Sequence, residues 1–392
     1  MITVEKVTTR EAFEALETAW NDLLANSTSD AVMLTHQWLL TWWDVFGEGR
    51  ELCIVLVRDG EQLIGIAPFL KRTVRHYGLL PFRRLEFLAS GEEECDEICS
   101  DYLNFILLRG HEKEALQAIL DFLLKQETDW DELLLTDIAG ESPNLPIVKE
   151  LGAARGLSWQ VTREQICVYV PLPATHDELL AAVSSQNRKR ILKDRRCLAD
   201  GTAQVKVFDS LDGFEEAFDI MVGLHQARWV ARGLPGSFAS TKFMRFHRTI
   251  APKLLSRGWA KLWLLCVEDE PVCALYDFVY ANKIFYYQSG LKIGEGPVRS
   301  PGLLLRDYSL EEAIGSGITE CDFLKGELGS YKFGWGPQTR PIIQVRLART
   351  GAREAVYSGA TGLVNSLRPL KRQLTGALKR SRGAEKPSES SP

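Results

Sequence analysis

One order of elements is predicted twice along this chain: helix, β-hairpin, helix and strand. In the first pass, apolar residues recur at helical spacing before and after two β-rich runs. Asp59-Gly60 lies between those runs, and an Asp-Gly pair is a strong signal for a tight hairpin turn. The first pass comprises helices over 10–24 and 38–46, strands over 53–57 and 63–69, a helix over 112–124 and a strand over 133–136.

The second pass repeats this order after residue 171. Thr175 is the expected N-cap of its first helix, and Glu178 completes a capping box with it. Gly233 and Gly258 follow two further helices at the usual place of a C-terminal glycine. The second pass comprises helices over 177–198, 212–232, 242–256 and 302–314 and strands over 205–208, 262–267, 271–279, 283–288 and 318–324. Two similar passes predict an α/β protein with a mixed sheet and two similar halves.

Length and composition allow two domains and a tail. A chain of 392 residues that is 45% hydrophobic can bury cores for both. We expect a first half over residues 1–165, a second half over 166–350 and a basic, disordered tail over 351–392, because the end of the chain is polar and rich in Ser and Pro. Alternatively, a basic helix over 363–379 would lie on an anionic membrane surface.

The charge balance and the amino terminus limit the classes of partner. With 47 basic and 52 acidic residues, no global field points to nucleic acid, so we expect no DNA partner and only a local phosphate site. The amino terminus lacks the pattern of a signal peptide, and no run of about 18 apolar residues occurs. We therefore expect a cytoplasmic protein.

Most of the eight cysteines lie inside apolar runs, where cysteine behaves as a small hydrophobe. Cys95 and Cys99 stand in an acidic stretch that would attract a cation. No second Cys or His pair at zinc-finger spacing accompanies them, so we expect no metal.

The segment from Asp322 to Trp335 crowds acids, lysines, a tyrosine and a tryptophan behind a predicted strand. Ends of strands are where sheets commonly place chemistry. The segment resembles the Asp-Phe-Leu-Arg-Gly-Asp-x-x-Tyr-Lys-x-x-Trp signature of the GNAT-like acetyltransferases associated with cellulose and exopolysaccharide synthesis, the CelD/BcsL family. Lys325 stands in place of the family's arginine and Glu327 in place of its aspartate, with one extra residue before Tyr331.

Further motifs resemble the same family in the same order. They are Thr35-His-Gln-Trp38, Ser100-Asp101-Tyr102, Asn187-Arg188-Lys189-Arg190 and the stretch from Leu224 to Phe238. The resemblance implies two GNAT-like halves, the second of them catalytic. It also implies acyl transfer from acyl-CoA, such as acetyl-CoA, to an amine or hydroxyl of an envelope or exopolysaccharide precursor.

Four residues are predicted to be catalytic. Glu327 and Asp322 are carboxylates that would take a proton from the acceptor, and Tyr331 would return one to the leaving thiolate. His225 lies beside Arg228 at helical spacing, so a lowered proton affinity would make it a neutral base. A packed histidine on an amphipathic helix is the structural alternative.

A pyrophosphate cradle is predicted before the helix over 302–314. Gly296, Arg299, Ser300 and Gly302 place glycines and a cation where backbone N–H groups and a helix dipole would face an anion. Pro301 removes one donor. A glycine-rich turn that only caps a helix is the alternative interpretation.

The predicted substrate-binding residues come from several motifs. Lys325 and Lys332 would hold a phosphate or an anionic sugar, and Trp335 would offer an apolar platform. The others are Arg228 and Trp229, which share a helix face with His225, and Asp101 and Tyr102, which rest on the family resemblance alone. Alternatively, Asp322 and Lys332 form a salt bridge and Trp335 belongs to the core.

Two other functions stay open at this point. Fem peptidyltransferases share a tandem GNAT fold and take aminoacyl-tRNA, and the basic run from Arg188 to Arg196 favours that reading. A non-catalytic partner of a polysaccharide synthase is the other. We expect a small-molecule or saccharide acceptor, tRNA only under the Fem-like alternative, and a peripheral contact with a membrane or synthase as a further option.

Overall fold

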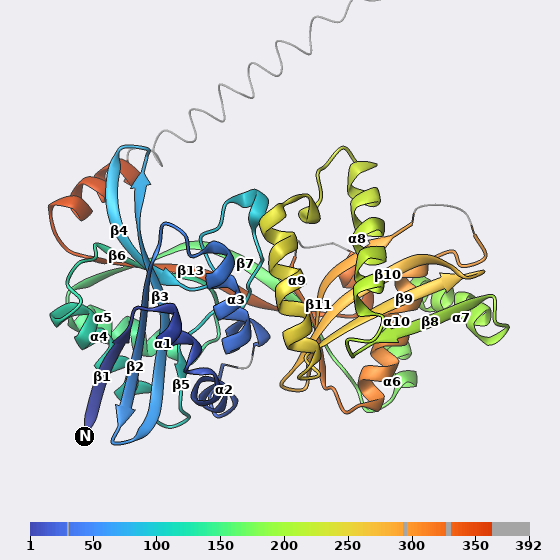
Figure 1. Ribbon diagram of the computed structural model, residues 1–392, viewed down its shortest axis with the longest axis horizontal. Coiled ribbons are helices and arrows are strands. Elements are labelled where there is room, and N and C mark those ends of the chain that lie inside the picture. The colour runs from blue at the N-terminus through green and yellow to red at the C-terminus, as the bar shows by residue number, and fades with distance from the viewer. Residues whose placement is uncertain (30, 293–295, 327–330, 363–392) are drawn as a thin grey trace, which may run out of the picture.

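The computed structural model describes residues 1–29, 31–292, 296–326 and 331–362, without the side chains of Tyr331 and Phe333. In these residues a single 13-stranded sheet runs through the molecule in the order β1-β2-β3-β4-β6-β13-β7-β12-β11-β10-β9-β8, with β5 paired to β3 (Figure 1). None of their helices is long and apolar enough to cross a membrane.

The first part of the sheet carries helices from the first pass of elements. Its elements are β1 Ile2–Val7, α1 Arg10–Glu14, α2 Glu17–Ala25, η1 Val32–Leu34, α3 His36–Phe46, β2 Glu51–Asp59, β3 Gln62–His76, β4 Leu80–Phe87, η2 Glu94–Asp96, β5 Ile106–Leu107, α4 Glu112–Lys125, β6 Glu132–Ala139, α5 Asn144–Ala154 and β7 Leu157–Pro171. β2 and β3 form the hairpin expected around Asp59-Gly60, with Asp59 opposite Gln62.

The second part follows the same plan. Its elements are α6 His176–Ala182, α7 Ser185–Ala199, β8 Ala203–Phe208, α8 Phe214–Val230, η3 Ser237–Ala239, α9 Thr241–Leu255, β9 Ala260–Val267, β10 Glu270–Tyr280, β11 Lys283–Leu291, α10 Pro301–Gly315, β12 Glu320–Gly326, η4 Tyr331–Trp335 and β13 Gln338–Arg349. The capping box of Thr175 and Glu178 is present at α6. The helix predicted over 177–198 is two helices, because Val183 is extended and the Ser184 hydroxyl caps a new helix at Asn187 N–H.

Each half contains one short parallel pair among antiparallel strands. β4 and β6 pair in parallel only from Arg84 to Glu86, and β11 and β12 only from Lys283 to Phe285. Beyond each pair the two strands no longer bond to each other. Gaps between the carboxyl ends of neighbouring parallel strands are where open α/β sheets commonly bind ligands.

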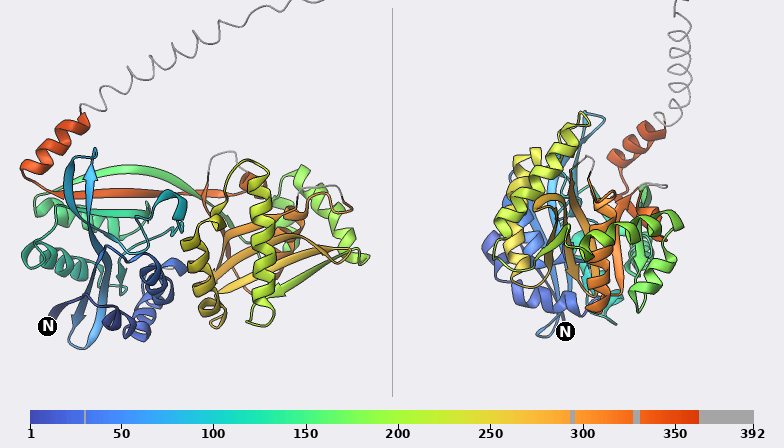
Figure 2. Two further views of the ribbon diagram at one scale, coloured as in Figure 1. Left: turned by 45° about the horizontal axis from the view of Figure 1, so that its top comes forward. Right: turned by 90° about the vertical axis from the view of Figure 1, so that its right-hand side faces the viewer.

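Two long strands join the halves. β13 pairs with β7 from Gln338 to Arg349 and also with β6, while β7 pairs on its other side with β12 (Figures 1 and 2). The last strand of the described residues therefore returns to the first half. The boundary predicted between residues 165 and 166 falls inside β7 and stays a prediction.

The tail expectation needs correction at its start. Residues 352–362 form a helix, in which Glu354 pairs with Arg346 of β13 at 2.6 Å and Tyr357 packs on His76 at 4.6 Å between ring centres. These contacts give the segment a buried face, so disorder is wrong for residues 352–362. The helix proposed over 363–379 lies outside the described residues.

Candidate active site

A cavity of about 530 Å³ opens where β11 and β12 separate. Its walls come from the ends of these strands, from β10 and from the starts of α7 and α10. The lining residues are Ser184, Gln186, Asn187, Arg190, Arg228, Cys273, Leu275, Tyr286, Ser289, Gly290, Leu291, Arg299, Ser300, Pro301, Gly302, Leu303, Arg306, Phe323, Gly334 and Trp335. The cavity thus occupies the gap between parallel strands in the second half.

One end of this cavity is suited to an anion. The amino-terminal turns of two 15-residue helices, α7 and α10, both reach it, and each carries the positive end of a helix dipole. Arg190 and Arg299 add exposed cationic side chains at the same helix starts. A phosphate group at this end would interact with the two helix dipoles and with the two arginine side chains.

The cavity also has an apolar wall. Leu275, Leu291, Leu303, Phe323 and Trp335 line it, and Trp335 is almost fully buried. This supports both readings of Trp335, which belongs to a core cluster and also faces the cavity. A polar end and an apolar wall make the cavity amphiphilic.

A β-bulge shapes the strand beside the cavity. Tyr276 lies opposite Gln288 but the next residue, Asp277, lies opposite Tyr286, so β11 has an extra residue at Tyr287. Tyr286 lines the cavity, whereas Tyr287 bonds to His247 on the side of α9. Bulges of this kind redirect side chains and are frequent next to active sites.

Three of the four predicted cradle residues line the cavity: Arg299, Ser300 and Gly302. Gly296 lines a separate cavity of about 150 Å³. A Cβ at Gly302 would meet nothing within 4 Å, and its backbone does not need glycine, so the missing side chain leaves open space at the helix start.

The predicted cradle differs from the structure in its backbone donors. The N–H groups of Arg299 and Ser300 donate to the Asp194 carboxylate at 3.2 and 2.7 Å. Asp194 is buried in α7 and so joins this helix to the residues directly before α10. Sequence reasoning missed Asp194, whose only signal is a single acid within the basic run of α7.

The signature segment meets the Asp-Tyr motif of the first half. Tyr102 donates to Asp322 Oδ2 at 2.6 Å, and the Lys325 backbone N–H donates to Asp101 Oδ2 at 2.8 Å. The Lys325 ammonium lies 3.2 Å from Asp101 Oδ1 and 2.9 Å from Asp137 Oδ2. Predicted site residues from two distant parts of the sequence therefore form one buried network.

Burial and charge shift the pKa values in this network. Burial raises the pKa of Asp322 to about 6, against the lowering effects of the Tyr102 hydrogen bond and of Arg340. Burial also raises the pKa of Asp101 to about 6, although Lys325 acts in the opposite direction. For Lys325 itself, burial favours a lower pKa, but the charges of Asp101 and Asp137 outweigh it and raise the pKa. Lys325 is therefore a fixed cation.

Backbone strain marks the same network. Tyr102, Asp137 and Leu324 have φ values of 64°, 50° and 57°, in the left-handed region that side-chain-bearing residues seldom adopt. Such conformations persist where surrounding contacts enforce them and are frequent at functional sites. The register between β12 and β7 shifts at this point, between Asp322 and Lys325.

Lys332 does not pair with Asp322 as the structural alternative supposed. Its ammonium donates to the backbone carbonyls of Phe323 and Lys325 at 2.6 and 2.9 Å. Burial lowers its pKa. Since protein acceptors already bind the ammonium groups of Lys325 and Lys332, their predicted anion binding would require new partners and stays a prediction.

Only Arg228 of the predicted group His225, Arg228 and Trp229 lines the cavity, while the ring centres of His225 and Trp229 lie 6.0 Å apart. His225 also packs edge-on against Phe238 at 5.0 Å, and its Nδ1 lies 3.0 Å from Gln226 Oε1. Burial is the main cause that lowers the pKa of His225, and Arg228 adds to it. Neither His225 nor Trp229 lines the cavity between β11 and β12, so their proposed roles stay predictions.

The side chains of two of the four residues predicted to be catalytic are not described by the structure. Glu327 and the side chain of Tyr331 lie outside the described residues. Asp322 is described and fully buried, and it does not line the cavity. Within the described residues no group of three or more metal-ligating side chains occurs.

Comparisons with known proteins agree with this geometry. Residues 185–332 match a family model described as "Acetyltransferase (GNAT) domain". That range includes α7, the strands around the cavity and α10. It supports acyltransferase activity for the second half. No match was found among curated proteins.

Solved structures extend the likeness to both halves. FemX is 13% identical with a TM-score of 0.63, and the alignment covers 91% of this chain and 99% of FemX. The C-terminal domain of a putative lysylphosphatidylglycerol synthetase from Agrobacterium fabrum is 10% identical with a TM-score of 0.49, covering 91% of this chain and 98% of that domain. At 13% identity the FemX likeness shows a shared fold alone. Together with the family match and the repeated strand plan, it confirms the predicted α/β fold with two GNAT-like halves.

Proposed function

We propose that the second half transfers an acyl group from acyl-CoA, such as acetyl-CoA, to an amine or hydroxyl of an acceptor. The amphiphilic cavity between β11 and β12 carries this proposal. Its polar end, at two helix starts, suits the phosphates of coenzyme A, and its apolar wall suits the arm that bears the acyl group. The match of residues 185–332 supports the same class of reaction.

The residues of the cavity have distinct tasks in this proposal. Arg190 and Arg299, with the starts of α7 and α10, would hold phosphate groups. Leu303, Phe323 and Trp335 would contact the acyl-bearing arm and exclude water from it. Bound acyl-CoA supplies the thioester carbonyl that the acceptor attacks.

In the reaction the acceptor nitrogen or oxygen bonds to the acyl carbon as the carbon–sulfur bond breaks. We assign Glu327 to take the proton that the acceptor loses and Tyr331 to protonate the departing thiolate. Asp322 is the second carboxylate proposed for proton transfer, and with a pKa of about 6 it is mostly ionised at neutral pH. His225 is kept as a further proposed base.

The proposed acceptor is an envelope or exopolysaccharide precursor. Support comes from the likeness of the segment Asp322–Trp335 to the CelD/BcsL signature and from the network that joins this segment to Asp101 and Tyr102. The network fixes the end of β12 between the two halves, where an acceptor would meet the acyl group.

Calorimetric titration with acetyl-CoA tests the proposal. Arg299→Ala should weaken binding about tenfold or more, because a charge-assisted bond to phosphate is lost. Arg75→Ala, which removes an exposed arginine of β3, is the matched control and should bind as the wild type does. Absence of acetyl-CoA binding to the wild type, or an unchanged affinity in Arg299→Ala, would contradict this use of the cavity.

A Fem-like transfer from aminoacyl-tRNA is the second candidate. It is favoured by exposed cations on α7 beside the cavity, namely Lys189, Arg190, Lys193 and Arg196. Binding of charged tRNA without binding of any CoA thioester would select it. Binding of acetyl-CoA without transfer to any sugar, peptide or amine acceptor would favour a non-catalytic partner of a polysaccharide synthase.

A further inference from the structure

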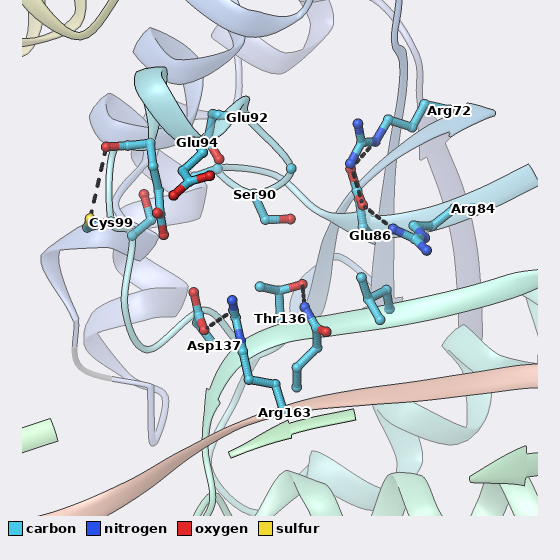
Figure 3. A pocket seen from close by; sticks show the side chains of 16 residues that line it. Arg72, Arg84, Glu86, Ser90, Glu92, Glu94, Cys99, Thr136, Asp137 and Arg163 are labelled. Carbon is cyan, nitrogen blue, oxygen red and sulfur yellow. Dashed lines mark hydrogen bonds and ion pairs between the residues drawn. The ribbon is translucent and has the colours of Figure 1, made fainter. Parts of the chain in front are cut away.

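The first half contains a second cavity, of about 440 Å³, in the corresponding place (Figure 3). It lies past the short parallel pair of β4 and β6, as the acyl-CoA cavity lies past that of β11 and β12. Its lining residues are Arg72, Arg84, Glu86, Ala89, Ser90, Gly91, Glu92, Glu94, Glu97, Cys99, Ser100, Leu134, Thr136, Asp137, Arg163 and Gln344. In each half of the sheet, the gap between the parallel strands therefore holds a cavity with polar lining residues.

This second cavity is not another phosphate cradle. In the second half residues 292–300 separate β11 from α10 in the sequence, whereas in the first half the much longer segment 88–111 separates β4 from α4. The first turn of α4 carries Glu112 and Glu114, which would repel an anion. Instead, residues 89–100 of that long segment line the cavity.

The cavity is built from buried polar side chains rather than from surface charges. Glu86, Ser90, Ser100, Thr136 and Asp137 are each at most 8% exposed. Ser90 donates to the Phe87 carbonyl at 2.7 Å, and Thr136 accepts a bond from the Gln344 amide at 3.3 Å. Each of the five has a partner in the protein, so the polar lining of the cavity is held in a fixed arrangement.

The positive charges of the cavity are already matched by carboxylates. Each of its three arginines faces an acid, in the pairs Arg72–Glu86 at 2.6 Å, Arg84–Glu132 at 2.7 Å and Arg163–Asp137 at 2.7 Å. Glu92 and Glu94 form no ion pair within the described part of the chain, and Figure 3 shows them across the cavity from Arg72 and Arg84. Glu92 accepts a hydrogen bond from the Trp42 indole N–H and burial raises its pKa to about 7, whereas Glu94 is exposed. The acidic groups of the cavity that lack a cationic partner therefore lie at one side.

Two residues of the cavity contact Lys325 of the second half. Glu97 and Asp137 line the cavity, and their carboxylates lie 3.5 and 2.9 Å from the Lys325 ammonium on β12. The same strand supplies Phe323 to the wall of the acyl-CoA cavity. Ala89 and Cys99, with φ values of 61° and 54°, add backbone strain on the first-half side.

We propose that this first-half cavity binds the acyl acceptor, and that the acceptor is a hydroxylated compound with a cationic amine, of the amino-sugar type. The assignment rests on the proposed acyl transfer. Glu92 and Glu94 would bind the amine, and Ser90, Thr136 and the paired arginines would bind hydroxyls. The network around Lys325 then links the acceptor to the end of β12.

Calorimetry on the full chain tests the assignment with two probes, glucosamine and glucose. Glucosamine should bind, and glucose, which lacks the amine, should bind at least about tenfold more weakly, since a charge-assisted bond is lost. Glu92→Gln and Glu94→Gln keep the shape of the side chain and should each weaken glucosamine binding by about the same factor. Glu61→Gln, an exposed glutamate of the β2–β3 turn, is the matched control and should have no effect.

A parallel titration with acetyl-CoA separates this assignment from the proposed function. Glu94→Gln should leave acetyl-CoA affinity unchanged, whereas Arg299→Ala should weaken acetyl-CoA binding and leave glucosamine binding unchanged. If acetyl-CoA binds but glucosamine does not, or if both Glu→Gln variants bind glucosamine like the wild type, the acceptor assignment is overturned while acyl transfer stands. If glucosamine binds in the predicted pattern but acetyl-CoA does not bind, the proposed function fails instead.

Discussion

Tyr102 donates its hydroxyl hydrogen to Asp322 Oδ2 at 2.6 Å, which joins two residues that lie 220 positions apart in the sequence. Asp322 is fully buried beside the register shift between β12 and β7, and its other oxygen accepts the Leu324 backbone N–H at 2.7 Å. Each carboxylate oxygen therefore has one donor, and one of the two donors comes from the other half of the molecule. The contact makes the geometry of β12 depend on the first half.

Tyr102→Phe should lower the free energy of unfolding by about 1 to 3 kcal/mol, because it leaves a buried carboxylate oxygen without its donor. Tyr169→Phe is the matched control, since Tyr169 donates to Gln338 in an exposed hydrogen bond. It should cost less than about 1 kcal/mol. Denaturant unfolding measures the free energy of unfolding of both variants. Equal losses would show that the hydrogen bond to Asp322 stabilises the protein no more than an exposed hydrogen bond does.

Asp322 should make the protein less stable as the pH rises from about 4 to about 6. Its pKa is raised to about 6 in the folded state from 3.8, so folding favours the protonated form. The stabilisation is complete below the unfolded pKa and is lost as the pH passes the folded pKa, a change of roughly 3 kcal/mol. Asp322→Asn should lack this component.

Unfolding titrations of both proteins at pH 4, 5, 6 and 7 isolate the effect as a difference, because other groups contribute equally to both curves. The difference should favour the wild type at pH 4 relative to pH 7. A pH-independent difference would mean that the Asp322 pKa is not raised in the folded protein.

Gly302→Val should weaken acetyl-CoA binding about tenfold or more without a large loss of stability. A Cβ there would meet no atom of the surrounding protein within 4 Å, so the added side chain would extend into the space proposed for the ligand. A Cβ at Gly315, at the other end of α10, also meets no atom within 4 Å, so Gly315→Val is the matched control. Calorimetry should show weaker acetyl-CoA binding in Gly302→Val alone, and thermal melting should show that both variants stay folded. A wild-type affinity in Gly302→Val would mean that acetyl-CoA binds at another site.

Glu327→Gln and Tyr331→Phe should each slow acyl transfer by about 10²-fold or more, the usual scale for the loss of a general acid or base. Acetyl-CoA binding should survive in both variants, which a parallel titration checks. Transfer at the wild-type rate in both would show that these residues have no role in proton transfer.

Tyr357→Ala should destabilise the protein by roughly 2 to 4 kcal/mol, because the ring packs on His76 and Phe82 and lies 3.9 Å from the Arg346 guanidinium. Val356→Ala, one position earlier and 58% exposed, should change stability by less than about 0.5 kcal/mol. Thermal unfolding compares the two. Indistinguishable melting temperatures would mean that residues 352–362 add nothing to the fold.

The sequence by itself determined most helices and hairpins and the order in which they repeat, but it did not predict β1, β4, α5 or β13. Hairpins at Asp59-Gly60, the capping box at Thr175 and the glycines after α8 and α9 depend on neighbours a few residues away, so local signals predicted them. Motif resemblance singled out Asp101, Tyr102, Asp322 and Lys325, which the fold brings together although nothing in their spacing requires it.

Only the tertiary structure decided which distant groups meet. The insertion of β13 between β6 and β7, the binding of Arg299 and Ser300 N–H groups by Asp194 and the cavity beside β4 and β6 all depend on long-range pairing. Local patterns do not record such contacts, because the energy that selects them comes from burial and hydrogen bonding between segments far apart in the chain. The same reason explains why Lys332 binds two carbonyls of β12 rather than the nearby acid at Asp322.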